Sequence, residues 1–537
     1  MTEDATTITN PILPGFNPDP SICRVGDDFY IATSTFEWFP GVQIHHSRDL
    51  VNWHLVTRPL TRASQLDMRG NPDSGGVWAP DLSYADGQFW LIYTDVKRNM
   101  GGWKDTHNYL VTAPSVYGPW SDPVHLNSSG FDPGLFHDED GRKWLVNMVW
   151  DHRQPGYGLH FAGILMQEYS PAEKRLVGPV RNIFCGTDLR FTEGPHLYRR
   201  DGFYYLITAE GGTGYNHAVT IARSRDIAGP YEVHPDKHIL TAKDDPDLTL
   251  QRAGHADMVD TPDGESYLVH LTSRPLEGLR RSPLGRETAI QKLVWSEDGW
   301  PRLATGGHAP QESVPAPALR PHPFPPEPVR IEFNEPELPL CFQWLRTPEP
   351  GRIFSLTERP GYLRLFGRES PGSFFEHALV ARRQTSIRYR AETELDYRPI
   401  FYQQFAGLIA WYNRHKYHYL AVSADEAGQR ELMILSCDGD YPEGRVKLPL
   451  EAPVRLPVDG PVRLGADVDG AELRFRYALA GGEWTDIDCV LDASALSDEA
   501  GSGEGKNFTG AFVGMAAQDI SGRGTPADFA HFLYEVL

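Results

Sequence analysis

The segment Asp201-Gly202-Phe203-Tyr204-Tyr205-Leu206 places a tight turn directly before a short apolar strand that begins with aromatic residues. The same order of turn, aromatic residue and aliphatic residue recurs in four other segments: Gly26-Asp27-Asp28-Phe29-Tyr30-Ile31, Asp86-Gly87-Gln88-Phe89-Trp90-Leu91, Asp140-Gly141-Arg142-Lys143-Trp144-Leu145 and Asp263-Gly264-Glu265-Ser266-Tyr267-Leu268. Four of the five segments contain Asp-Gly, whose tolerance of positive φ suits a two-residue hairpin turn. The N-terminal part of the chain is therefore predicted to consist of repeated hairpins.

These hairpins recur at a regular interval. Their aromatic anchors are separated by 60, 54, 61 and 62 positions: Tyr30, Trp90, Trp144, Tyr205 and Tyr267. Further strand-like runs follow each anchor, so each repeat has the length of a four-stranded blade with its loops. A β-helix, the alternative, needs much shorter repeats. The pattern predicts an all-β chain that begins with a five-bladed β-propeller.

Proline is concentrated between His308 and Arg330, where it occupies eight of 23 positions and disfavours both helix and central strand. We therefore predict a propeller over residues 1–309, a proline-rich linker over 310–328 and a second domain over 329–537. The alternative is a proline-rich loop wrapped over one large domain.

The second domain also has strand-like runs, at 462–468 and 472–477, with the turn Asp469-Gly470 between them. These runs lack the 60-residue period of the N-terminal part. Short strands without that period favour a β-sandwich.

Overall composition excludes several classes of function. The 537 residues carry a net charge of −21, which would repel a phosphate backbone, and no apolar run approaches the roughly 20 residues needed to cross a bilayer. The five cysteines are odd in number and never spaced C-x-x-C, so they fit neither a disulfide framework nor a zinc site. The start Met1-Thr2-Glu3-Asp4 lacks the features of a secretory signal. We expect a cytoplasmic protein with neither a nucleic-acid nor a membrane partner.

Three acidic residues occupy one equivalent position of the repeat. Counting back 11 or 12 positions from each anchor gives Asp19, Ala79, Asp132, Glu193 and His255. Equivalent positions at the starts of the innermost strands of a propeller face one another across its channel, so these side chains are expected to converge. An Asp next to Pro can simply start a turn. That explanation suffices for a single acid, but it accounts less well for three acids at equivalent positions of the repeat.

Converging carboxylates repel one another, so one is expected to hold its proton near neutral pH while another stays ionised. Hydrolysis of a glycosidic bond uses such a pair, one acid protonating the leaving oxygen and one carboxylate acting on water or on the sugar. The residues alone predict a glycosidase and leave open which acid is which.

Other residues near the acids suit a sugar ligand. Phe36 and Trp78 are aromatic residues of adjacent loops, although core packing explains most aromatic residues in a chain of this size. Arg286, in Gly285-Arg286-Glu287-Thr288, is either a surface cation or a fork that binds sugar hydroxyls and steadies a catalytic carboxylate.

At this point the motifs resemble glycoside hydrolase family 43, and most closely its two-domain β-xylosidases. The resemblance covers nearly the whole chain and rests on Asn17-Pro18-Asp19-Pro20-Ser21, Trp78-Ala79-Pro80-Asp81, Phe131-Asp132-Pro133-Gly134, Thr192-Glu193-Gly194-Pro195-His196 and Gly285-Arg286-Glu287-Thr288. It implies a five-bladed β-propeller followed by a concanavalin-like β-sandwich, and an inverting mechanism. Asp19 matches the general base, Glu193 the general acid, and Asp132 the residue that raises the proton affinity of the acid and orients it.

The resemblance also implies the substrate pocket. Residues matching the site for the terminal xylose are Phe36, Trp78, Thr213 and Arg286. His255 matches a histidine on the propeller axis that contacts a calcium ion through water; a core histidine is the alternative. Phe508, in the segment 507–512, matches a residue of a sandwich loop that closes the pocket. A closed pocket implies exo action, and no organic cofactor is required.

The expected function is therefore an exo-acting inverting β-xylosidase that releases xylose from the non-reducing end of β-1,4-xylo-oligosaccharides, with α-L-arabinofuranosidase activity as a second activity. The resemblance favours a homo-oligomer. One rival is a retaining fructan or sucrose hydrolase, but its Asn-Asp-Pro-Asn-Gly start is absent; the other is a non-catalytic sugar-binding propeller.

Overall fold

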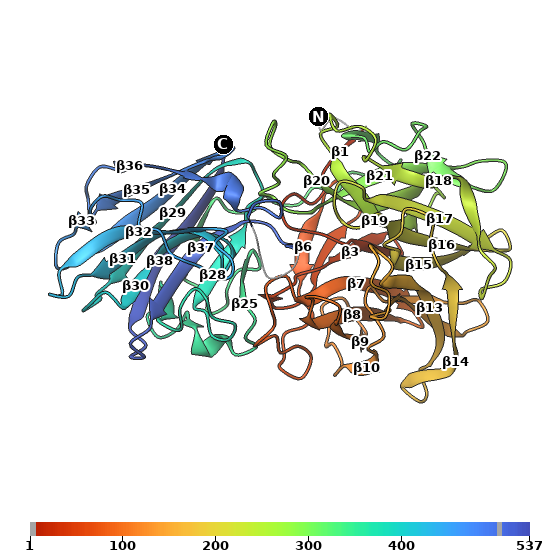
Figure 1. Ribbon diagram of the computed structural model, residues 1–537, viewed down its shortest axis with the longest axis horizontal. Helices are drawn as coiled ribbons and strands as arrows, with labels where there is room; N and C mark the ends of the chain where they lie inside the picture. Colours follow the sequence, from red (N-terminus) through yellow and green to blue (C-terminus); the bar gives the residue numbers. More distant parts are fainter. Residues whose placement is uncertain (1–6, 502–506) are drawn as a thin grey trace.

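The structure is a computed structural model that describes residues 7–501 and 507–537, so the expectation about Met1-Thr2-Glu3-Asp4 lies outside the described residues. Across the described ranges the chain is built of strands, with two short 3-10 helices, η1 (Pro350–Arg352) and η2 (Ala493–Ala495). The predicted all-β fold is confirmed. No helix in these ranges is long and apolar enough to cross a membrane. Figure 1 shows two bodies side by side, the N-terminal propeller on the right and the C-terminal sandwich on the left.

The propeller has five blades within the described residues, each an antiparallel sheet of four strands. From the innermost strand outward, the blades are β2 (Ser21–Val25), β3 (Asp28–Thr33), β5 (Gln43–Ser47) and β6 (His54–Thr57); β7 (Gly76–Ala85), β8 (Gln88–Arg98), β9 (Asp105–Ala113) and β10 (Val124–Asn127); β11 (Gly134–His137), β12 (Lys143–Trp150), β13 (Phe161–Ser170) and β14 (Arg175–Phe184); β15 (Glu193–Arg200), β16 (Phe203–Glu210), β17 (Ala218–Ser224) and β18 (Glu232–Thr241); and β19 (Gln251–Asp260), β20 (Ser266–Ser273), β21 (Glu287–Trp295) and β22 (Pro301–Leu303).

The repeated turn connects the first two strands of a blade. Asp201 and Gly202 both have positive φ, 49° and 77°, and they join β15 to β16. The anchor Tyr205 lies on β16 opposite Tyr198 of β15, and the other anchors lie on the second strand of their own blades. The Asp-Gly turn therefore determines how the first two strands of a blade pair, as the sequence predicts. The five inner strands contact one another around the axis, and β19 meets β2 to close the ring.

The sandwich consists of two eight-stranded sheets within the described residues. One has the order β26 (Phe354–Ser355), β27 (Leu363–Phe366), β38 (Pro526–Val536), β29 (Arg388–Tyr397), β34 (Val462–Asp469), β35 (Glu472–Leu479) and β36 (Thr485–Asp492), with β24 (Arg330–Glu332) also paired to β38. The other has the order β33 (Val454–Arg455), β32 (Arg430–Asp438), β31 (Lys416–Ala424), β30 (Gln404–Asn413), β37 (Phe512–Asp519), β28 (Leu379–Arg383), β25 (Phe342–Leu345) and β4 (Trp38–Phe39).

The second sheet is buried on both faces. On β30, Leu408 and Ala410 join the core between the two sheets, whereas Ile409 and Trp411 join a cluster that includes Phe16 of the propeller. Alternating side chains of one strand thus serve two cores. This packing fixes the sandwich against the propeller and places its loops beside the channel.

Two strand pairings are not indicated by the sequence pattern. β4, which lies within the first repeat, pairs with β25 and so completes a sheet of the sandwich. β1 (Thr7–Thr9) pairs with β23 (Ser313–Pro315), which lies inside the predicted proline-rich linker. The domain limits 1–309, 310–328 and 329–537 remain predictions.

Candidate active site

The three acidic residues of the repeat line one cavity at the mouth of the propeller channel. Asp19 lies just before β2, Asp132 just before β11, and Glu193 is the first residue of β15. The cavity measures about 50 Å³ and is lined by Asp19, Phe36, Trp78, Phe131, Asp132, Glu193, Thr213, His217, His255, Arg286 and Phe508. By the rule that one water needs about 10–15 Å³ of such space, it is far too small for a polysaccharide chain.

The backbone turns sharply where these side chains enter the cavity. Asp19, Asp132 and His255 have positive φ values of 54°, 53° and 45°, which are uncommon for residues other than glycine. Glu193 instead lies beside a bulge, because the pairing of β15 with β16 shifts between Glu193 and His196. Bulges and left-handed residues re-aim side chains next to functional sites. Equivalent positions of the repeat thus direct their side chains toward one point.

Asp19 is buried and is held as a carboxylate by its neighbours. Burial is the largest single influence and would raise the pKa of Asp19, but the Arg286 guanidinium, His255, the Ser34 hydroxyl and His217 together outweigh it, so the pKa lies below its ordinary value. Arg286 Nη1 donates to Asp19 Oδ1 at 2.9 Å, and the Ser34 hydroxyl donates to Oδ2 at 2.7 Å. His255 Nδ1 lies 3.9 Å from Oδ1, but burial lowers the pKa of His255 to about 4. His255 is therefore neutral at pH 7, and Arg286 is the permanent charge beside Asp19.

Asp132 has the opposite electrostatic environment. Burial raises the pKa of Asp132 well above its usual range, and the charges of Glu193 and Asp19 raise it further. A hydrogen bond from the Gly194 backbone and the charge of Arg286 oppose this rise without cancelling it. The pKa values of Asp19 and Asp132 are therefore shifted in opposite directions, so the Asp132 side of the cavity keeps a proton to a higher pH than the Asp19 side does.

Arg286 also joins the sandwich loop to the cavity. Its Nε and Nη2 donate to the Phe508 carbonyl oxygen at 3.1 and 2.8 Å, and its Nη1 donates to the Thr213 hydroxyl at 3.2 Å. The Phe508 backbone N–H in turn donates to the Ser74 hydroxyl at 3.0 Å. Gly285 permits this approach, because a Cβ there would lie 2.2 Å from the carbonyl oxygen of Thr509.

Aromatic side chains form one wall of the cavity. The ring centroids of Phe36 and Trp78 lie 6.1 Å apart, and Phe508 lies 6.1 Å from the first and 5.6 Å from the second. Trp78 also meets Phe131 edge to face at 5.0 Å. Such a wall can pack against the apolar face of a sugar ring, while Arg286 faces its hydroxyls.

The cavity contains two residues that the sequence pattern does not single out as site residues. His217 lines it, and burial lowers the pKa of His217 to about 3. Phe131 was part of a motif but had no assigned role. Neither lies at an equivalent position of the repeat that would distinguish it from a core residue.

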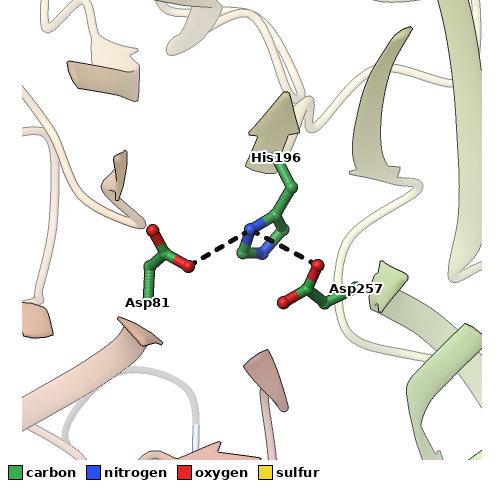
Figure 2. Close-up of side chains that lie close together, drawn as sticks. All are labelled: Asp81, His196 and Asp257. Carbon is green, nitrogen blue, oxygen red and sulfur yellow. Dashed lines mark ion pairs between the residues drawn. The ribbon is translucent and has the colours of Figure 1, made fainter. Parts of the chain in front are cut away.

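A group that could hold a metal ion lies on the same inner strands. Figure 2 shows the His196 ring between two carboxylates, with Nδ1 3.6 Å from Asp81 Oδ1 and 3.9 Å from Asp257 Oδ1. Within the described ranges, these three residues form the one group of at least three His, Cys, Asp or Glu side chains whose ligand atoms lie close enough together to share a metal ion. Asp257 accepts the Ile22 N–H at 2.7 Å and Asp81 accepts the Leu135 N–H at 2.6 Å. Each acid therefore ties neighbouring inner strands together.

The calcium ion implied by the resemblance, which His255 would contact through water, stays a prediction. Calcium takes about six to eight oxygen ligands, and the oxygen atoms of Asp81 and Asp257 accept hydrogen bonds from Ser21, Leu135, Ile22 and Met258. His255 is not part of the group, and the carboxylate beside it, that of Asp19, is bound to Arg286. We therefore assign no chemical step to a metal.

Comparisons with known proteins agree with this geometry. The family model for glycosyl hydrolases family 43 matches residues 8–301, and the model for the beta xylosidase C-terminal concanavalin A-like domain matches residues 330–535. The chain is 59% identical to xylosidase/arabinosidase 43B of Humicola insolens over 98% of this chain and 97% of the relative. It is 52% identical to a beta-xylosidase of Bacillus subtilis (strain 168) over 98% and 99% of the two chains.

A solved structure shares the whole fold. The crystal structure of xylan beta-1,4-xylosidase from Bacillus halodurans C-125 superposes with a TM-score of 0.95 at 53% identity, covering 98% of this chain and all (100%) of that one. The predicted propeller and concanavalin-like sandwich are thereby confirmed. From its motifs, its fold and these matches, the chain belongs to glycosyl hydrolase family 43.

Proposed function

We propose that the protein is an exo-acting, inverting β-xylosidase that releases xylose from the non-reducing ends of β-1,4-xylo-oligosaccharides. The observation that carries the proposal is that the pKa values of two carboxyl groups are shifted in opposite directions within one small cavity. Arg286 and the other neighbours of Asp19 lower its pKa, whereas burial and neighbouring carboxylates raise the pKa of Asp132. Acid and base catalysis of glycoside hydrolysis require this division.

In the proposed reaction Asp19 is the general base. Its carboxylate takes a proton from a water molecule while the water oxygen bonds to the anomeric carbon. Glu193 is the general acid and gives its proton to the glycosidic oxygen as the bond from that oxygen to the anomeric carbon breaks. Attack and departure on opposite faces of the sugar invert the configuration, so the first product is α-xylose.

Asp132 is proposed to act through Glu193 rather than on the sugar. A negative charge on either of these two carboxylates disfavours a negative charge on the other. The pair therefore keeps a proton available for the leaving group while Asp19 is ionised. Asp132 is accordingly a positioning residue in this scheme.

The cavity walls support single-sugar, exo-acting recognition. The small volume and the position of Phe508 in the wall limit entry to the end of a sugar chain. Phe36 and Trp78 would pack against the ring, and Arg286, with Thr213 and His255 nearby, would bind hydroxyls.

The substrate range remains part of the proposal. The Humicola insolens relative is named for both xylosidase and arabinosidase activity, which supports α-L-arabinofuranosides as second substrates. We also propose a cytoplasmic homo-oligomer that acts on short oligosaccharides without an organic cofactor. Side-by-side rates on an aryl xyloside and an aryl arabinofuranoside measure the first point, and light scattering after size exclusion measures the oligomeric state.

A proton NMR time course on xylobiose tests the proposed reaction. Inversion releases α-xylose first, and the β-anomer grows only as mutarotation proceeds. Early β-xylose would instead indicate a retaining double displacement, as in the rival fructan or sucrose hydrolases. Absence of hydrolysis would favour a sugar-binding propeller.

A further inference from the structure

A second cavity, of about 490 Å³, lies between the first blade and the sandwich and, among the residues that the structure describes, shares no lining residue with the active site. Its walls come from β5 and β6 of the propeller, from the segment 324–327 and from β28 of the sandwich. β6 lies on the side of the propeller that faces the sandwich (Figure 1). We call it the interdomain cavity, and its polar wall is defined by Gln43, His45, Arg58, Glu327, Arg382 and Arg383.

The interdomain cavity carries an excess of buried positive charge. Arg58, Arg382 and Arg383 line it and are only 5%, 7% and 6% exposed. Among its lining residues, all of which the structure describes, the single carboxylate is that of Glu327, which accepts from Arg382 Nη2 at 2.9 Å and is itself mostly exposed. Arg58 and Arg383 have no carboxylate partner in the described part of the chain. Buried charges in proteins are normally paired.

Two of these guanidinium groups also have unused donors. Within the described residues, Arg383 Nη2 and Arg382 Nε are buried and lack a hydrogen-bond partner. The remaining bonds of Arg58 go to neutral acceptors, the Gln43 side-chain oxygen and the Phe342 carbonyl oxygen. Burial lowers the pKa of Arg58 to about 9, which reflects the same lack of compensating charge. The polar wall of the interdomain cavity therefore carries positive charge that no carboxylate of the described residues balances, apart from Glu327 at Arg382.

We propose that the interdomain cavity binds a small oxyanion, a phosphate or a carboxylate, between Arg58, Arg382 and Arg383. Planar guanidinium groups present paired donors that match both kinds of oxyanion. The volume accommodates the anion alone or an anion attached to a sugar, for which Trp53 and Phe324 provide an aromatic surface.

The proposed site connects to the segment that carries Asp19. Arg58 Nε donates to Gln43 Oε1 at 3.0 Å, and Gln43 Nε2 donates to Asn17 Oδ1 at 2.7 Å. Arg383 Nε donates to the Phe16 carbonyl oxygen at 2.6 Å. An anion that orders these arginines would therefore brace the loop before Asp19 and the contact between the two domains.

Isothermal titration calorimetry and thermal unfolding of the full chain in a chloride buffer test the proposal. The probes are inorganic phosphate, ribose 5-phosphate and glucuronate, each added with and without saturating xylose. We expect saturable binding that raises the melting temperature with probe concentration and that xylose does not displace. Tighter binding of inorganic phosphate indicates a free ion, and tighter binding of a sugar-linked probe indicates an anionic sugar; both support the site.

Variants identify the cavity as the place of binding. Arg383→Gln should weaken affinity at least about tenfold, as expected for loss of a charged hydrogen bond. Glu327→Gln should strengthen affinity severalfold, because it removes the competing carboxylate; being exposed, it also provides the test if Arg383→Gln does not fold. Arg445→Gln, at an exposed arginine of the sandwich, is the matched control and should change nothing.

Three results would overturn the proposal. They are the absence of saturable binding of every probe, displacement of the bound probe by xylose, and equal affinity in the wild type, Arg383→Gln and Glu327→Gln.

Discussion

Replacing Arg286 by glutamine should make the carboxyl group of Asp19 harder to ionise. The substitution removes the permanent positive charge whose Nη1 lies 2.9 Å from Asp19 Oδ1. Without that charge the protonated form of Asp19 is favoured, so its pKa rises. Because the proposed base must be ionised, activity should be lost at a higher pH than in the wild type as the solution is acidified.

The size of this effect follows from the contact. Two opposite charges about 4 Å apart interact by about 4 kcal/mol at an effective dielectric constant of about 20. Since about 1.4 kcal/mol corresponds to one pKa unit, about 3 units is an upper limit. The Ser34 hydroxyl still donates to Asp19, and water can enter the space left by the guanidinium. We therefore expect the acid limb of the kcat/KM profile to move upward by about one to three pH units.

The assay is a pH profile of kcat/KM on an aryl xyloside. Both Arg286→Gln and the control Arg286→Lys should lower the rate at every pH, because Arg286 lines the cavity; the position of the limb is therefore the readout. Arg286→Lys keeps the charge and should leave the limb near its wild-type position. An unmoved limb in Arg286→Gln would refute the electrostatic role of Arg286.

Three further predictions concern the loop and the metal. Gly285→Ala should raise KM and lower the melting temperature, because the added Cβ would collide with the Thr509 carbonyl oxygen and the backbone φ of 72° is strained for alanine. A wild-type KM in this variant would show that the pocket does not need the close contact between Gly285 and the sandwich loop. Phe508→Ala should raise KM for xylobiose about tenfold or more, because the sugar loses an aromatic contact, and it should change the melting temperature little. An unchanged KM would show that Phe508 does not contact the substrate. A chelator should leave kcat/KM unchanged, because no step of the proposed reaction uses a metal; loss of activity restored by calcium would contradict this.

The propeller could be predicted because its signals are local. Each Asp-Gly turn specifies the hairpin that follows it, so one motif repeated about every 60 residues indicates the blades. The same register brings the three acids together, since equivalent inner-strand positions share one mouth. The strand-like run at 472–477 is likewise a strand, β35.

Contacts between distant segments could not be predicted in this way. β4 pairs with β25 across three hundred residues, and nothing in the two residues Trp38 and Phe39 indicates a partner in another domain. His217 reaches the active site by tertiary packing, and its own neighbours in sequence give no sign of it. The buried arginines of the interdomain cavity come from two domains, and their shared shortage of carboxylates appears only when the chain is folded.

The most direct test of the central claim compares two leaving groups in Glu193→Ala and Asp19→Ala. Removal of a general acid costs about 10²–10⁴ in rate when the leaving group needs protonation, and much less when it does not. We predict that Glu193→Ala loses far more activity on xylobiose than on an aryl xyloside with an acidic phenol, and that Asp19→Ala loses both alike. Equal losses on the two substrates in Glu193→Ala would contradict the division of roles between Asp19 and Glu193.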